Sequence, residues 1–196
     1  MEHNIIILTI ATFLTVSCNS HSEKKYDKEV IELNNRAIEL MISNPDSALI
    51  ILDKATEIDE TYYVAYSNKV NIYISNGNFD QAIHSAKKEV HAKPDLAEAV
   101  TMLGMLYDYT GQINKAGEQY DKAIDLYNNR LTTSDKHKQA NRLNRAHTLL
   151  LLGKGAEGQK EIQQLLKENP DDFAIQMLVD FDKDKYLNDL FGQRKK

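Results

Sequence analysis

The stretch GKGAEG, residues 153–158, has the glycine spacing of a dinucleotide-binding turn. In such a turn the glycines let the backbone approach a pyrophosphate at the N-terminus of the next helix. That chemistry needs a parallel sheet, but beyond the N-terminal segment no β-branched run could pair with a strand at Leu149–Leu152. A phosphate-binding loop also requires a Ser or Thr after its lysine, and Gly155 follows Lys154. The glycines therefore need another explanation.

The histidines and the cysteine do not form a catalytic or metal-binding pattern. His84 and His91 lie on one expected helix, about 10 Å apart along its axis, which is too far to share one metal. His137 and His147 have no carboxylate three or four residues away, and Cys18 is the only cysteine. We therefore expect a protein that is not an enzyme and has no metal and no cofactor, although a site assembled from distant residues stays open.

The charge distribution argues against nucleic acid as a partner. The 196 residues include 29 acidic and 24 basic side chains, which gives a formal net charge of −5. Both signs are interspersed along the chain, so no face is expected to follow a phosphate backbone. With 42% hydrophobic and 27% charged residues, the composition is that of an ordinary globular protein.

The N-terminal segment predicts export. Ile5–Val16 is an uncharged run with the length of a signal-peptide core, too short to span a bilayer. The junction TVSC at Thr15–Cys18 resembles a bacterial lipobox. The resemblance implies that residues 1–17 are removed, that Cys18 is lipidated, and that residues 18–27 form the lipidated Cys and a polar tether. The protein would then be lipid-anchored in the bacterial cell envelope, at the outer membrane facing the periplasm. A plain cleaved signal and a retained anchor are the alternatives.

The rest of the chain has an internal period of 34 residues. Ala48, Ala82 and Ala116 are each 34 apart, and Gly77 and Gly111 are separated by the same 34. A fixed period of this length indicates stacked supersecondary units, each of which buries its apolar face against its neighbours.

The repeated residues resemble the tetratricopeptide repeat (TPR), and the third unit carries most of the family's pattern. Its matching residues are Leu103, Gly104, Tyr107, Gly111, Ala116, Tyr120 and Ala123. The resemblance implies an all-α fold, a right-handed TPR superhelix or α-α solenoid of about four helical hairpins plus a C-terminal capping helix.

The expected boundaries follow from the alanine register. A TPR domain over 28–192 would hold repeats at about 29–62, 63–96, 97–130 and 139–172, with a cap at 173–192. An insertion at about 132–139 precedes the fourth repeat, and we expect Phe173, Met177 and Phe181 to cover that repeat.

This register explains the glycines of GKGAEG. Gly153 takes the turn position that ends the first helix of the fourth hairpin, where a left-handed backbone suits glycine. Gly158 takes the close-packing position that alanine fills in the other repeats.

In this family the first helix of each hairpin lines a concave groove. The groove positions in this chain are Ser67, Asn71, Ile74, Glu98, Thr101, Met105, Asp108, Tyr109, Leu143 and His147. The resemblance implies that these residues hold an extended or helical peptide, although the apolar ones could equally pack inside the superhelix. We therefore expect a non-catalytic adaptor or scaffold that binds a protein or peptide partner in the envelope. A glycan-binding or small-ligand-binding lipoprotein is the alternative.

Overall fold

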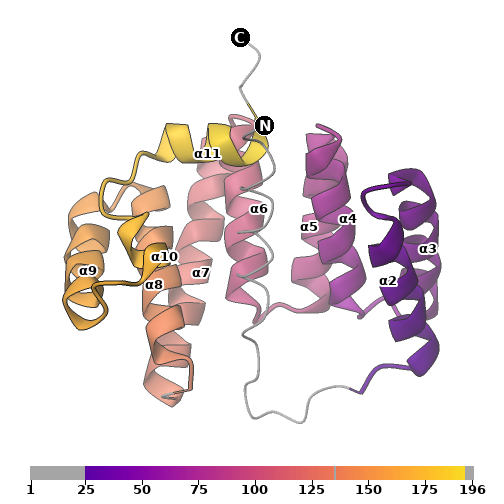
Figure 1. The fold of residues 1–196 in the computed structure, drawn as a ribbon, viewed down its shortest axis with the longest axis horizontal. Helices are drawn as coiled ribbons and strands as arrows, with labels where there is room; N and C mark the ends of the chain where they lie inside the picture. Colours follow the sequence, from indigo (N-terminus) through magenta and orange to yellow (C-terminus); the bar gives the residue numbers. More distant parts are fainter. Residues whose placement is uncertain (1–24, 135, 193–196) are drawn as a thin grey trace. The chain divides into compact units, whose positions relative to one another are not determined.

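The computed structural model describes residues 25–134 and 136–192, which form ten α-helices and no strand (Figure 1). The helices form consecutive hairpins α2/α3, α4/α5, α6/α7 and α8/α9, followed by the short helices α10 and α11, so the all-α hairpin fold expected from the sequence is confirmed. The bounds are Lys28–Leu40 (α2), Pro45–Ile58 (α3), Tyr63–Ser75 (α4), Phe79–Ala92 (α5), Ala97–Tyr109 (α6), Ile113–Thr133 (α7), Lys138–Leu152 (α8), Gly155–Glu168 (α9), Phe173–Gln176 (α10) and Lys183–Phe191 (α11).

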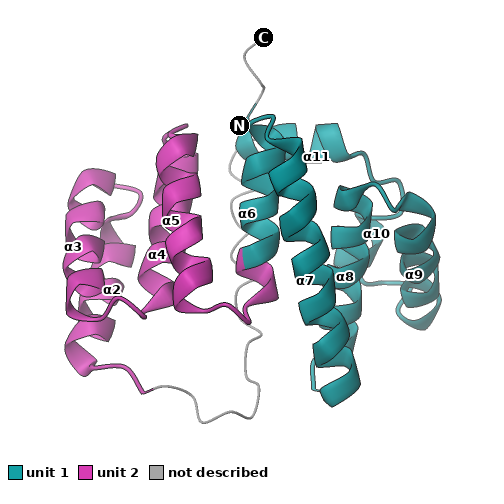
Figure 2. Cartoon of the chain, turned by 180° about the vertical axis from the view of Figure 1, so that it is seen from behind, with its two compact units in different colours: residues 1–19, 100–196 teal, residues 20–99 magenta. Residues whose placement is uncertain are grey.

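The described residues belong to two compact units, which meet within α6 (Figure 2). One unit, which we call the N-terminal unit, holds α2 to α5 and the first turn of α6, through residue 99. The other, the C-terminal unit, begins at residue 100 and holds the rest of α6 with α7 to α11. Each unit is described below by itself.

The hairpin of α2 and α3 shows how small residues close the core of the N-terminal unit. Asn44 caps α3 by accepting a hydrogen bond from the Ser47 backbone N–H, and Pro45 stands at the first turn, where its missing N–H costs nothing. Ala48 and Ala55 are fully buried, so the helices that meet there approach closely. Alanine at a repeated position therefore sets the spacing between helices.

Tyr26 joins this unit, although the sequence placed it in the polar tether. Its ring meets Tyr62 edge-on with centroids 4.8 Å apart, and its hydroxyl donates to the Thr61 carbonyl at 3.2 Å. The folded part of the chain therefore includes Tyr26, and an aromatic contact ties the segment before α2 to the turn before α4.

The front helices α2 and α4 are linked by a pair of amides one period apart. The Asn68 side-chain amide donates to the Asn34 Oδ1 atom at 2.8 Å, and Asn34 is buried. A buried amide requires a partner, so this bond fixes how the two front helices lie against each other.

The glycines of GKGAEG have the roles that the repeat register predicts. Gly153 ends α8 with φ 89°, and Gly158 lies at the closest approach of α9 to α8. A Cβ atom at Gly158 would lie 2.9 Å from the Ala146 carbonyl oxygen and 2.9 Å from Leu150. Gly153 therefore makes the turn and Gly158 the close contact, and both lie in a helical hairpin.

The insertion before the fourth hairpin lengthens α7. This helix has 21 residues, whereas each of α3, α5 and α9 has 14. A short connection follows, in which His137 has a left-handed backbone with φ 58° just before α8. Of the expected insertion at about 132–139, residues 132 and 133 end α7, and residues 138 and 139 begin α8.

The expected roles of Phe173 and Met177 were wrong. Their side chains are 67% and 52% exposed, while Ile175 and Leu178 join the core made by α8 and α9. Asp172 caps α10 and begins a single helical turn, in which residues three apart share a face. Ile175 and Leu178 therefore face inward, and the two larger side chains take the outer face. Phe181, the third residue expected there, does pack against this core.

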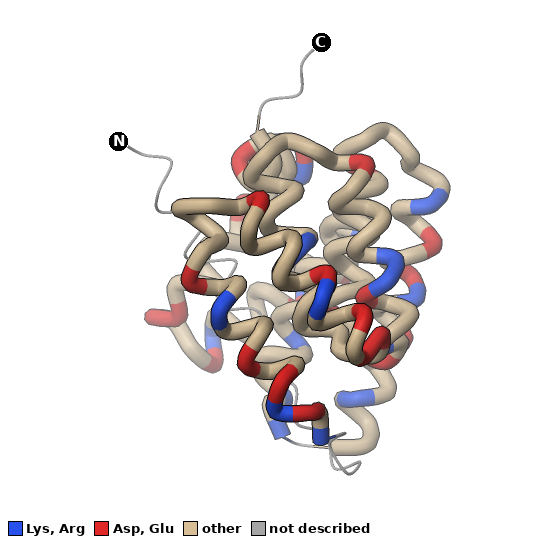
Figure 3. The backbone as a smooth tube through the Cα atoms, turned by 90° about the vertical axis from the view of Figure 1, so that its right-hand side faces the viewer, with Lys and Arg blue, Asp and Glu red and all other residues tan. Residues whose placement is uncertain are grey.

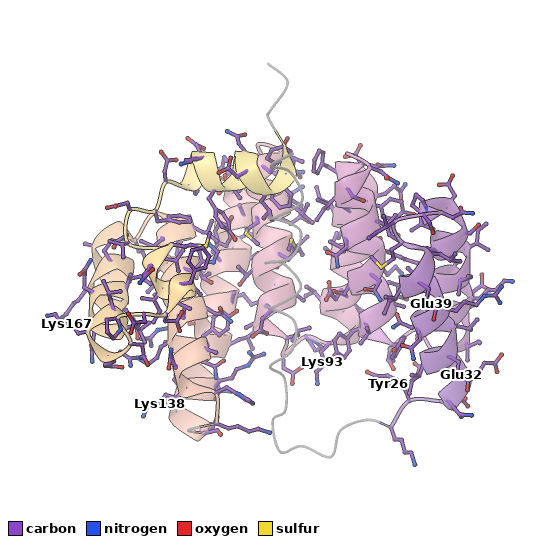
Figure 4. The ribbon with its side chains drawn as sticks, in the orientation of Figure 1. Tyr26, Glu32, Glu39, Lys93, Lys138 and Lys167 are labelled. Atoms are coloured by element: carbon purple, nitrogen blue, oxygen red, sulfur yellow. The ribbon has the colours of Figure 1, made fainter. Side chains whose placement is uncertain are left out.

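Basic and acidic residues are interspersed along the helices (Figure 3). Lys138 at the start of α8 and Lys167 near the end of α9 are exposed at the surface (Figure 4). Within residues 25–134 and 136–192, no helix combines the length and the apolar character needed to cross a bilayer. The predicted signal peptide and Cys18 lie outside the described residues.

Candidate functional site

The groove positions on α4 are spaced four and three residues apart, so they share one face of the helix. Asn71 and Ile74 are half-buried and three residues apart, so they lie on one face of the helix. Ser67 hydrogen-bonds to the carboxyl group of Glu89 on α5, and Glu89 is 2% exposed. Ser67, Asn71 and Ile74 are all half-buried, and Ser67 is in addition bonded to α5.

Two of the groove positions on α6, Thr101 and Met105, are buried. Thr101 and Thr148 are both buried, and their hydroxyl oxygens lie 3.4 Å apart, which links α6 to α8. Met105 is buried, and Glu98 is half-buried. The hydroxyl pair and the neighbouring apolar side chain therefore stabilise the packing of α6 in place of an open binding surface.

Asp108 and Tyr109, at the end of α6, contact the C-terminal helix α11. The Asp108 carboxylate accepts a hydrogen bond from Lys183 Nζ at 3.0 Å and one from the Tyr120 hydroxyl at 3.4 Å. The Tyr109 ring packs on Phe191 with centroids 5.1 Å apart, and its hydroxyl donates to the Gly192 carbonyl at 2.9 Å. Figure 1 shows α11 beside the end of α6.

His147 on α8 is enclosed by aromatic rings from the same C-terminal segment. Its ring meets Phe181 and Tyr186 edge-on, with centroids 5.3 Å and 4.8 Å away. Burial lowers the pKa of His147 to about 4, so the imidazole is neutral at physiological pH. Its Nε2 atom is buried without a hydrogen-bond partner. An unsatisfied buried polar atom costs free energy, so this contact is not fully complementary.

We call the surface formed by Asp108, Tyr109 and His147 the α6–α8 face. The sequence predicted an open groove there, but the chain's own residues 181–192 cover all three positions. Leu143, expected in the same groove, belongs to the core shared with Ile175. The sequence analysis did not foresee that residues 181–192 lie on these positions.

The missed signal was the spacing of the residues in α11. Lys183, Tyr186, Leu187 and Phe191 fall at intervals of three, one and four, which place them on one side of a helix. This pattern indicates an amphipathic helix, but it does not tell which surface the helix covers. The segment lies outside the repeat, so its packing partner had no sequence signal.

The other histidines of the described part of the chain lie at its surface. His84 and His91 are both exposed, and His137 is exposed beside its turn. Among residues 25–134 and 136–192, no three His, Cys, Asp or Glu side chains are grouped to hold a metal ion.

Helical hairpins at a 34-residue period, closed by small residues and turn glycines, define an all-helical repeat protein. Residues 63–95 and 97–130 match the sequence model of the tetratricopeptide repeat family. The two hairpins over residues 63–130 therefore belong to the tetratricopeptide repeat family.

Curated relatives match parts of the chain. Anaphase-promoting complex subunit 3 of Schizosaccharomyces pombe is 25% identical over 126 residues, which are 64% of this chain and 18% of that protein. Heat shock protein STI1 of Saccharomyces cerevisiae is 32% identical over 82 residues, 41% of this chain and 14% of that protein. Photosystem I assembly protein Ycf3 of Synechococcus is 28% identical over 103 residues, 53% of this chain and 56% of that protein. The chain thus spans a small part of the first two relatives and about half of the third.

Solved structures share the fold. MamA aligns with a TM-score of 0.51 and 22% identity, covering 72% of this chain and 78% of MamA. PilW, described as a type IV pilus biogenesis factor, aligns with a TM-score of 0.56 and 18% identity, covering 84% of this chain and 77% of PilW. At these identities the likeness concerns the helical-hairpin fold.

Proposed function

We propose that this protein is a non-catalytic adaptor that binds a protein partner through the front helices of its repeats. The observation that carries the proposal is the α6–α8 face, where groove positions of the TPR family contact a helix, here the chain's own α11. A surface that accommodates one helix by an ion pair and aromatic contacts has the chemistry to bind polypeptide.

The N-terminal unit supports the same function in a different way. Asn71 offers an amide that can donate to and accept from a peptide backbone, and Ile74 adds an apolar contact beside it. These two side chains lie in the matched repeat at 63–95. We propose that they form the partner contact of this unit.

We further propose that lipidated Cys18 holds the adaptor at the bacterial outer membrane, facing the periplasm. The support is the apolar run Ile5–Val16 followed by TVSC. More than one acyl chain would be needed for stable anchoring, because a single chain binds membranes only marginally. With Tyr26 packed on the domain, the tether between Cys18 and the folded unit has seven residues, 19–25.

Site-specific photocrosslinking in cells tests the adaptor function. A photoreactive amino acid replaces Asn71 on the front helix α4 or, as the matched control, exposed Lys87 on the back helix α5. We expect a discrete protein adduct from position 71 and none from position 87. The partner is identified by mass spectrometry, and its purified form must bind the wild-type chain and lose affinity for Asn71→Ala. Equal adducts from both positions, or none, would contradict the proposal.

The anchor has a separate test. Cys18→Ser should abolish incorporation of labelled palmitate and release the protein from the membrane fraction. Continued labelling of Cys18→Ser would refute the assigned lipidation site without bearing on partner binding.

A further inference from the structure

The contact between α11 and the rest of the C-terminal unit is built like a receptor with a bound helix. On one side of α11, Lys183, Tyr186 and Phe191 reach Asp108, His147 and Tyr109 respectively. Leu187 lies between them and is fully buried. The other side of α11 carries the exposed residues Asp184, Lys185 and Asp189.

The receptor side supplies complementary chemistry for each of these contacts. The Asp108 side chain is 4% exposed, so its carboxylate needs a cation or another donor beside it. Tyr109 and His147 offer ring faces and edges to aromatic side chains. The Tyr109 hydroxyl donates to the main-chain carbonyl of Gly192, just beyond the end of α11. Because the acceptor is a backbone group, this contact does not depend on which side chain the helix carries at that position.

Two features indicate that α11 is a replaceable occupant. The helix has nine residues, and isolated helices shorter than about 12 residues are marginal in water, so α11 depends on these contacts to form. The fit is also incomplete, because His147 Nε2 and Asn188 Oδ1 are buried without hydrogen-bond partners. A helix that supplied a partner for His147 Nε2 would gain an interaction that α11 lacks.

We propose that the α6–α8 face is a receptor for an amphipathic helix of a partner protein, and that α11 is its intramolecular competitor. The partner helix carries a cationic residue, an aromatic residue three positions later, a leucine at the next position and an aromatic residue four positions after that. The inference rests on the proposed adaptor function and specifies its ligand and its regulation. Because α11 must leave first, the affinity of the wild-type chain equals the affinity of the uncovered face multiplied by the fraction of time for which that face is uncovered.

Binding of the chain's own segment in trans provides the test. The probe is a fluorescein-labelled peptide of residues 180–192, and the receptor is the full chain carrying Leu187→Asp, which places a charge at the buried centre of α11. Lys185→Asp is the matched control, because it introduces the same residue on the exposed side of the same helix. Fluorescence anisotropy should show binding to Leu187→Asp at least about tenfold tighter than to wild type or Lys185→Asp.

A charge exchange shows whether the peptide occupies the assigned site. Adding Asp108→Lys to Leu187→Asp should abolish binding of the wild-type peptide, and a peptide carrying Lys183→Glu should restore it. Equal binding of both peptides to both receptors would mean non-specific adhesion to exposed apolar surface and would overturn the proposal. A folded Leu187→Asp chain, judged by circular dichroism, that binds no peptide would also overturn it.

Hydrogen exchange on the wild-type chain keeps the proposal testable if Leu187→Asp does not fold. Amides of residues 183–191 should exchange faster than those in the centres of α7 and α8, because α11 opens without global unfolding. Equal protection of all three helices would contradict a replaceable α11. A wild-type dimer that Leu187→Asp converts to monomers would assign the face to α11 of a second copy and overturn the partner assignment.

The peptide-binding and crosslinking experiments test the receptor proposal and the adaptor proposal independently. If the peptide binds Leu187→Asp by the charge-exchange criterion while crosslinking at position 71 captures no partner, the receptor holds and the adaptor function fails in the N-terminal unit. If a partner is captured at position 71 and the peptide does not bind, the adaptor function holds and the receptor proposal fails.

Discussion

Lys183 Nζ lies 3.0 Å from Asp108 Oδ2, joining α11 to α6 across 75 residues of sequence. Asp108 is the more buried partner, with 4% of its side chain exposed, against 35% for Lys183. Lys183→Ala would leave the carboxylate buried with its cation removed, and we expect a loss of about 1–2 kcal/mol in the free energy of unfolding. Urea denaturation followed by circular dichroism measures the loss.

Lys185→Ala is the control for that substitution. Lys185 is exposed on the opposite side of α11, and an exposed substitution of this kind changes stability by less than about 0.5 kcal/mol. Equal effects of the two substitutions would mean that helix propensity, and not the ion pair, determines the loss.

His147 makes the stability of the C-terminal unit depend on pH. Burial lowers its pKa from 6.5 to about 4, so between these values the unfolded chain takes up a proton and the folded chain does not. Stability is therefore lost as pH falls from about 6.5 to 4, by about 2–3 kcal/mol from this residue. His147→Leu should remove that part of the pH dependence. Urea midpoints at pH 7 and pH 4.5 for both chains measure it, and identical shifts in the two chains would contradict the assignment.

Glu89 acts in the opposite direction in the N-terminal unit. Burial raises its pKa from 4.5 to about 8, so the folded chain keeps a proton that the unfolded chain loses. Its contribution therefore falls as pH rises from about 4.5 to 8. Glu89→Gln keeps the hydrogen-bonding shape toward Ser67 without a titrating group, and it should raise Tm more at pH 8 than at pH 5. A gain that is the same at both pH values would argue against a protonated Glu89.

Gly158 and Gly155 offer a matched pair within GKGAEG. At Gly158 a Cβ atom would lie 2.9 Å from the backbone oxygen of Ala146, whereas at Gly155 it would meet nothing within 4 Å. Gly158→Ala should cost about 1–3 kcal/mol by forcing α9 away from α8. Gly155→Ala should be neutral or stabilising by up to about 1 kcal/mol, because alanine favours the helix. Thermal unfolding of both variants measures the two effects. Equal stabilities would mean that the contact between α8 and α9 does not require glycine at position 158.

The repeated part of the fold could be predicted from the sequence because the same physical requirement recurs along it. Alanine at positions 34 apart indicated close helix contacts, and Gly153 indicated the turn, which the structure shows with φ 89°. A periodic pattern predicts local structure and neighbouring contacts together, since each hairpin packs on the next in sequence.

The occupied state of the α6–α8 face could not be predicted in the same way. His147 and Asp108 were selected from their repeat positions, but their contacts come from Tyr186 and Lys183, which lie outside any repeat. The sequence shows that α11 is amphipathic and leaves its packing partner undefined. The assignment of Phe173 to the core was wrong for a related reason, because α10 is one turn long and the sequence did not show where it begins.

The amide pair of Asn34 and Asn68 means that the hairpins cannot be deleted freely. Their side chains bond at 2.8 Å across 34 residues, and the next residue in this register is Met102. Loss of the second repeat by recombination would place methionine opposite the buried Asn34 and leave its amide oxygen without that donor. An array that lacks this hairpin would therefore fold less well than the intact one, even though the hairpins look interchangeable.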